Sequence, residues 1–174
     1  MKMGLIFVLI TFLIIYSCIF ASISFSPWFS WSRNALSDLG HCIRSKSAPI
    51  YNFGLAIGGL LLSIYSIIFL KNNTKITWIV MFITSIFLQL IGVYDEAYRS
   101  LHGLVSVSFF ISMWISMVIL SIEKGLKIGV ITSIIYIIIW ILYYNKIYSS
   151  GVSVPELLSS LTATLLIIFH EYRT

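Results

Sequence analysis

The residues best suited to chemistry lie in two short polar stretches that interrupt an otherwise apolar chain. The first stretch contains Asn34, Ser37 and Asp38, and the second contains Asp95 and His102. Carboxylates and an imidazole can bind a divalent metal, act as acid and base, or hold the polar headgroup of a lipid or small ligand. These residues therefore form a candidate ligand-binding site, provided that the fold brings the two stretches together.

A divalent metal is the cofactor that this set of side chains would fit, with Asp38, Asp95 and His102 as its ligands. A simpler interpretation stays open. Asp95 and Arg99 are spaced to form an ion pair at the surface of a solvated turn, and such pairs stabilise a protein little. If the turn is helical, Asp95, Arg99 and His102 share one face.

The segment from Asn34 to Gly40 has two possible structures. It could be a short interfacial helix that Asn34 caps and that Gly40 ends in a left-handed conformation. It could instead be a re-entrant cap that directs Asn34, Ser37 and Asp38 into the mouth of a helical bundle. The sequence gives only weak support for a Ser-His-Asp triad, since Ser37 is not in a nucleophile elbow and Asp38 follows it directly.

Composition determines the elements that must position these residues. The chain has 174 residues, of which 59% are hydrophobic and 10% are charged, whereas soluble domains have about 25% charged residues. A soluble protein of this size could not bury so much apolar surface. Within lipid the backbone must satisfy its own hydrogen bonds, and long continuous apolar runs favour helices over barrel strands. We therefore expect an all-α, polytopic transmembrane helical bundle.

Apolar runs predict about six membrane spans in a single domain. A span needs about 20 apolar residues, and the runs cover residues 4–26, 48–70, 76–94, 103–122, 126–144 and 154–169. The sixth is the weakest, because it is short and rich in Ser and Thr, so it could be re-entrant. The first is too long for the apolar core of a signal peptide and is expected to be a transmembrane helix.

Alternation of the spans places the first, third and fifth loops at the same membrane surface. Both polar stretches should meet there, together with Glu156 at the start of the sixth span. Lys and Arg flank the two sides almost equally, six against five, so they give little bias to the orientation. Lys2 and the pair Lys71 and Lys75 favour a cytoplasmic N-terminus in a cell membrane.

The net charge of +5 does not predict a nucleic-acid partner, because the basic residues are scattered along the chain. The expected partner is the lipid bilayer, and no Walker loop, dinucleotide fingerprint or HExxH motif is present. The first function to consider is a ligand- or lipid-handling protein. The alternatives are an accessory subunit with membrane-protein partners and, last, a small transporter, since no inverted repeat is visible.

Three short motifs resemble a known family of membrane proteins. They are N-A-L-S-D-L-G at residues 34–40, Y-N-F-G at residues 51–54 and G-V-Y-D at residues 92–95, the last followed by His102. Over roughly residues 4–169 the chain is similar to domain of unknown function 998, a multi-spanning family of archaea and bacteria without an agreed activity. The resemblance implies that its recurring polar positions here are Asn34, Ser37, Asp38, Asn52, Asp95 and His102. The Ile- and Ser-rich composition suggests an archaeal source.

Overall fold

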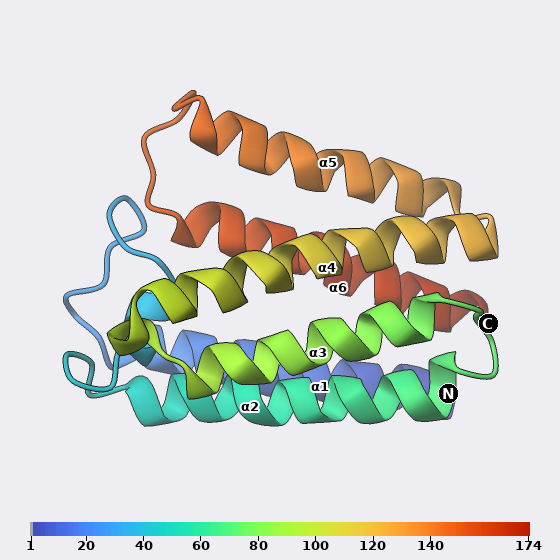
Figure 1. Ribbon diagram of the computed structural model, residues 1–174, viewed down its shortest axis with the longest axis horizontal. Helices are drawn as coiled ribbons and strands as arrows, with labels where there is room; N and C mark the ends of the chain where they lie inside the picture. Colours follow the sequence, from blue (N-terminus) through green and yellow to red (C-terminus); the bar gives the residue numbers. More distant parts are fainter. Residues whose placement is uncertain (1) are drawn as a thin grey trace.

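Six α-helices lie along one long axis in the computed structural model, which describes residues 2–174 (Figure 1). They are α1 Met3–Ser24, α2 Ala48–Tyr65, α3 Thr77–Val93, α4 Ser100–Lys124, α5 Lys127–Tyr144 and α6 Ser153–Arg173. Two 3-10 turns, η1 Ser37–Gly40 and η3 Glu96–Tyr98, lie in loops, and a π-helical turn, η2 Ser66–Leu70, extends α2. The predicted all-α bundle is confirmed.

Within residues 2–174, five helices are long and apolar enough to cross a bilayer, namely α1, α2 with η2, α4, α5 and α6. The remaining helix, α3, has 17 residues, a length of about 26 Å against a hydrocarbon core of about 30 Å. The sixth segment, predicted to be the weakest span, is a helix of 21 residues. Its hydroxyls do not interrupt it, because Ser160 and Thr162 donate to carbonyls of the same helix.

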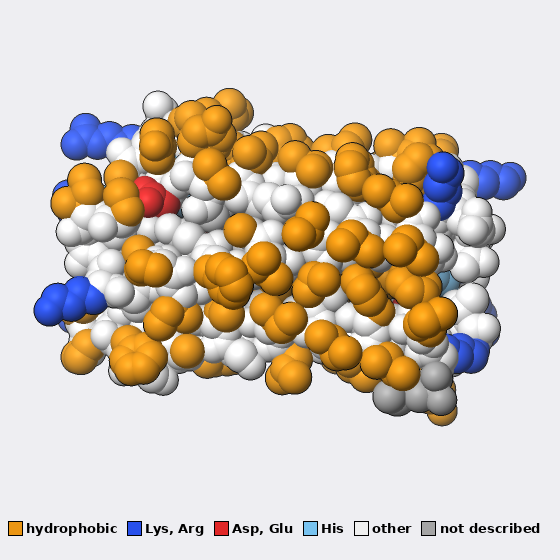
Figure 2. Space-filling view, turned by 90° about the horizontal axis from the view of Figure 1, so that it is seen from below, with side chains coloured by type: hydrophobic (Ala, Val, Ile, Leu, Met, Phe, Trp, Pro, Cys, Tyr) orange, Lys and Arg blue, Asp and Glu red, His pale blue; other side chains and the backbone are white. Residues whose placement is uncertain are grey.

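The outer surface is apolar along most of the bundle. Figure 2 shows hydrophobic side chains over the middle of one face, and Lys and Arg side chains at its two ends. The exposed apolar residues are dense on α5, where Ile131, Ile134, Ile138 and Ile141 all face outward. Soluble proteins rarely expose so large an apolar surface. The chain is therefore a multi-pass membrane protein whose outer helices contact lipid.

Glycines hold α2 close to both of its neighbours. A side chain at Gly58 would meet Ile15 of α1, and a side chain at Gly59 would meet the α3 backbone at Ser85. Small residues let helix backbones approach in this way, which increases the van der Waals contact that drives association in lipid. The glycine pattern of the second span is thus used for packing inside the bundle.

The first, third and fifth loops meet at one end of the bundle, at the left of Figure 1, and both termini lie at the other end. The N–H of Gly151 donates to Trp31 O at 2.9 Å, which joins the fifth loop to the first. The Ser37 hydroxyl donates to Glu96 Oε1 at 3.0 Å, which joins the first loop to the third. The predicted meeting of these loops is confirmed.

Candidate functional site

Asn34 and Asp38 form a closed turn in front of η1. Asn34 Nδ2 and the backbone N–H of Ala35 both donate to Asp38 Oδ2, each at 2.9 Å. The other amide atom of Asn34, Oδ1, accepts the N–H of Ser30 at 2.9 Å. The polar atoms of these two side chains thus fold the loop on itself and fix the position of Ser37.

Gly40 ends this turn, but the prediction of a left-handed glycine there is wrong. Among residues 2–174 the only glycine with a positive φ is Gly125. Position 40 has no room for a side chain, since a Cβ there would meet Asn52 Oδ1 and the ring of Tyr51. Asn52 Nδ2 donates to Gly40 O at 2.9 Å, so Asn52 anchors η1 to α2.

The third loop is not one continuous helix. Asp95 caps η3 by accepting the N–H of Ala97 at 2.8 Å, and it also accepts the N–H of Cys42 at 3.2 Å. Arg99 has a φ of 48°, which separates η3 from α4. The condition under which Asp95, Arg99 and His102 would share a helical face is therefore not met. Asp95 and Arg99 form no ion pair in the described part of the chain.

His102 is buried in the first turn of α4 and points into the bundle. Its Nδ1 lies 2.7 Å from Tyr94 O, and its Nε2 lies 3.2 Å from the Ser106 hydroxyl and 3.8 Å from Glu96 Oε1. Because a carbonyl oxygen can only accept, the proton is assigned to Nδ1. In the neutral ring Nε2 is then an acceptor, and the Ser106 hydroxyl donates to it.

The structure does not bring Asp38, Asp95 and His102 together as a group of metal ligands. Between residues 2 and 174, no group of three His, Cys, Asp or Glu side chains is placed to share a metal ion. The physical reason is that each of the three is committed elsewhere. Backbone N–H groups use oxygens of both aspartates, and the two nitrogens of His102 face Tyr94 O and Ser106.

Ser37, Glu96 and His102 lie together, but their order differs from that of a catalytic triad. In a triad the imidazole lies between the hydroxyl and the acid. Here Glu96 Oε1 lies between them, accepting from the Ser37 hydroxyl at 3.0 Å and facing His102 Nε2. The arrangement is a polar cluster that can bind donors and acceptors, without an activated serine.

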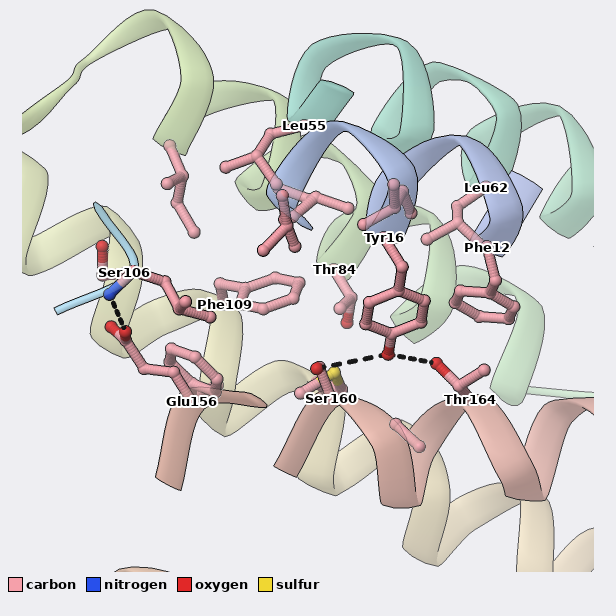
Figure 3. A pocket seen from close by; sticks show the side chains of 18 of the residues that line it. Phe12, Tyr16, Leu55, Leu62, Thr84, Ser106, Phe109, Glu156, Ser160 and Thr164 are labelled. Carbon is pink, nitrogen blue, oxygen red and sulfur yellow. Dashed lines mark hydrogen bonds between the residues drawn. The ribbon is translucent and has the colours of Figure 1, made fainter. Parts of the chain in front are cut away.

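A cavity of about 90 Å³ runs through the bundle from this cluster (Figure 3). Five helices contribute to its wall, and no residue of α5 does. Most of the wall is apolar, with side chains such as Phe12, Leu55, Leu62 and Phe109. One end is polar, and there Ser37, Ser106 and Glu156 line the cavity.

Glu156 is the carboxylate that reaches this cavity. It lies in the first turn of α6, where the helix dipole favours negative charge. Its Oε2 accepts the N–H of Leu36 at 2.7 Å (Figure 3). Its Oε1 accepts no hydrogen bond from residues 2–174, and no Lys or Arg among them pairs with it. A carboxylate oxygen therefore stays available to a ligand.

A second polar contact crosses the cavity wall farther along the axis. The Tyr16 hydroxyl of α1 donates to Ser160 Oγ at 3.2 Å and lies 2.9 Å from Thr164 Oγ1, both on α6 (Figure 3). These groups satisfy one another and join α1 to α6. Two further hydroxyls of the wall, those of Thr84 and Ser116, donate to carbonyls of their own helices.

The structure divides the six predicted site residues by role. Ser37 lines the cavity, and His102 touches it through Ser106. The remaining four, Asn34, Asp38, Asn52 and Asp95, stabilise the loops around it. Glu96, Ser106 and Glu156 were not among the predicted site residues. The signal for Glu156 was present in the sequence, since it is a single acid at the start of an otherwise uncharged apolar segment.

A family model matches this chain over residues 9–170, and its description is a protein of unknown function, DUF998. Comparisons with curated proteins and with solved structures find no match. The matched range includes all three sequence motifs and part or all of every helix of the bundle. The chain therefore belongs to the DUF998 family of proteins of unknown function.

Proposed function

We propose that this protein binds an amphiphilic ligand of the membrane, such as a lipid. The apolar chain of the ligand would occupy the central cavity, and its polar head would lie at Ser37, Ser106 and Glu156. The observation that carries the proposal is the cavity itself, which is mostly apolar along its length and has the carboxyl group of Glu156 at one end. An amphiphile has the same division between an apolar and a polar part.

The energetics of packing support an occupant. Protein interiors are close-packed, and a void of about 90 Å³ lowers stability by about 2 kcal/mol at the cost measured for engineered cavities. An apolar chain would restore van der Waals contacts along the wall, whereas water has few partners there. At the polar end, a headgroup would provide the partner that Glu156 Oε1 lacks within residues 2–174.

Purification in a mild detergent followed by native mass spectrometry tests this proposal. We expect wild-type protein to retain a stoichiometric amphiphile that organic solvent extracts. Ala163 lines the cavity on α6, so Ala163→Phe should fill the space and abolish retention. Thr84→Leu on α3 provides an independent cavity-filling variant. Leu165→Phe is the matched control, because Leu165 lies on α6 and faces outward.

Loss of the ligand tests the proposal only if the variant is folded. Each variant is therefore first checked by size-exclusion chromatography and circular dichroism. Wild-type protein that neither carries nor takes up an amphiphile would contradict the proposal. Unchanged retention by folded Ala163→Phe and Thr84→Leu proteins would also contradict it, because the ligand would then lie outside the cavity.

We also propose that the N-terminus faces the cytoplasm. Lys2 and the pair Lys71 and Lys75 lie at the end of the bundle that carries both termini, and the first helix usually dominates orientation. The polar end of the cavity would then face the opposite side of the membrane. This orientation makes the headgroup site accessible from the outer leaflet.

A further inference from the structure

The chemistry of the ligand can be specified from the shape and charge of the cavity, and this step rests on the proposed function. We infer that the ligand is an amphiphile with one alkyl chain and a cationic amine head. The shape of the cavity limits the number of alkyl chains in the ligand, and the acids at its polar end determine the chemical class of the ligand's head.

The cavity is long and narrow. Its lining extends from Ser106 to Met117 on α4 and from Glu156 to Ile167 on α6, and either distance is about 16 Å at the rise of an α-helix. Spread over that length, a volume of about 90 Å³ leaves room for one narrow row of water-sized positions. Such a row over this length is a single file. Two parallel acyl chains would need a second row, so the shape selects an amphiphile with one chain.

Two acids, Glu156 and Glu96, lie at or beside the polar end of the cavity. Glu156 lines the cavity, and Glu96 lies beside it through Ser37, which lines the cavity and donates to Glu96. In the described chain no Lys or Arg forms an ion pair with either acid, and His102 Nε2 lies 3.8 Å from Glu96 Oε1. A carboxylate in a membrane interior is costly unless a cation or hydrogen-bond donors compensate it.

An ammonium group supplies both forms of compensation. It carries a positive charge and three N–H donors, and the polar end offers acceptors in Glu156 Oε1 and the Ser37 and Ser106 hydroxyl oxygens. Phe109 lies at the same end of the cavity (Figure 3), and aromatic rings attract cations. A fatty acid or a phosphate head would instead bring its own negative charge beside the two acids, Glu156 and Glu96.

Competitive binding of three amphiphiles with the same chain tests the head. The probes are n-dodecylamine, n-dodecanol and n-dodecanoate, added together to delipidated protein and quantified by native mass spectrometry. Wild-type protein should bind the amine over the alcohol by about tenfold or more, the ratio expected for a hydrogen bond to a charged group. Binding of the carboxylate should be weaker than binding of the alcohol.

Two variants test which acids cause the preference for the amine over the alcohol. Glu156→Gln keeps an acceptor for the N–H of Leu36 but removes the charge, so the amine-to-alcohol ratio should fall by about tenfold while alcohol binding persists. Glu96→Gln provides a second variant and should lower the ratio as well. Glu123→Gln is the matched control, because Glu123 lies at the opposite end of α4, and its ratio should equal that of wild-type protein.

The outcomes separate this inference from the proposed function. Equal binding of amine and alcohol, or preference for the carboxylate, would overturn the amine head while amphiphile binding stands. A two-chain phosphatidylethanolamine that displaces n-dodecylamine from the cavity would overturn the single chain. If no probe binds and the cavity-filling variants change nothing, the proposed function itself fails.

Discussion

Acidic side chains at the loop end of this protein act mainly as acceptors for backbone N–H groups. Asp38 accepts from Ala35, and Asp95 accepts from Cys42 and Ala97. Backbone donors near the membrane need such partners, because lipid offers none. Glu156 also accepts one backbone N–H, but it differs from the two aspartates because it lines the central cavity and they do not. That difference distinguishes a candidate ligand-binding acid from acids that support the loops.

The Cys42 thiol reports directly on the charge of Asp95. A hydrogen bond to the Asp95 carboxylate is the main cause that raises the pKa of this exposed thiol. A higher pKa leaves less thiolate at a given pH, so alkylation should be slow and should begin at higher pH. We expect Asp95→Asn to increase the maleimide reaction rate at neutral pH, by up to about tenfold for each unit by which the pKa falls.

The measurement uses a Cys18→Ser background, so that Cys42 is the only thiol. Asp38→Asn serves as the control, because the carboxylate of Asp38 binds Asn34 and Ala35 and not Cys42. Equal rates in Asp95→Asn and the parent protein across the pH range would show that Asp95 does not act on the thiol.

The sequence could predict which polar residues gather at one membrane surface more easily than it could predict what each of them does there. The sequence identifies Ser37 and His102 as polar residues at one membrane surface, and the structure places both at or beside the polar end of the cavity. It could not show that Asp38 and Asp95 would be occupied by backbone donors, because those donors belong to tertiary turns. The predicted metal ligands are therefore engaged in these turns, and metal binding stays a prediction. The sequence places Glu156 at the same surface, but whether its side chain faces the cavity depends on the rotation of α6 about its axis.

At the scale of elements, the short helix α3 is held at its start by a residue from another helix. Glu123, near the end of α4, accepts the N–H of Ile76 at 2.7 Å and the Thr77 hydroxyl at 2.7 Å, with further contacts to the N–H groups of Lys75 and Thr77. First-turn N–H groups have no partner within their own helix. A carboxylate from α4 therefore performs the role that a local capping residue usually has.

Removing this cap should destabilise the bundle. Glu123→Ala leaves several N–H groups without an acceptor, and we expect it to lower the free energy of unfolding by about 1–3 kcal/mol. Glu123→Gln should cost less, because its amide oxygen can still accept. Denaturation in mixed detergent micelles measures both, with the exposed Lys127→Ala as control. A Glu123→Ala protein as stable as that control would mean that water caps α3 equally well.

The contact between α2 and α3 gives a second prediction for this scale. A Cβ added at Gly59 would lie 2.7 Å from the backbone oxygen of Ser85, which cannot move without shifting α3. Gly59→Ala should therefore lower stability by about 1–3 kcal/mol, as overpacking does. Gly103→Ala is the matched control, because nothing lies within 4 Å of the added atom, and its higher helix propensity should make it neutral or slightly stabilising. Equal melting temperatures for the two variants would contradict close packing at Gly59.

For the whole molecule, the sequence predicted the architecture and the meeting of the loops but not the cavity. Apolar runs marked all six helices, and alternation of spans was enough to bring residues 34–40 and 95–102 to one end. The cavity arises where side chains of five helices fail to fill the space between them. No local pattern encodes that space, because it depends on how the helices cross and on their rotation about their axes.

The same alternation predicts which loops can be labelled from each side of the membrane. In a background without Cys18 and Cys42, single cysteines are introduced by Lys146→Cys in the fifth loop and Lys71→Cys in the second, and native Cys42 is tested in a Cys18→Ser protein. With a cytoplasmic N-terminus, an impermeant maleimide should label residues 42 and 146 in intact cells. Position 71 should react only after permeabilisation.

Labelling of 42 and 146 from opposite sides would show that the helices between them do not all cross the membrane. If 42 and 146 react only after permeabilisation and 71 reacts in intact cells, the six-span arrangement stands and the orientation is reversed, so the amphiphile's head would lie at the cytoplasmic surface.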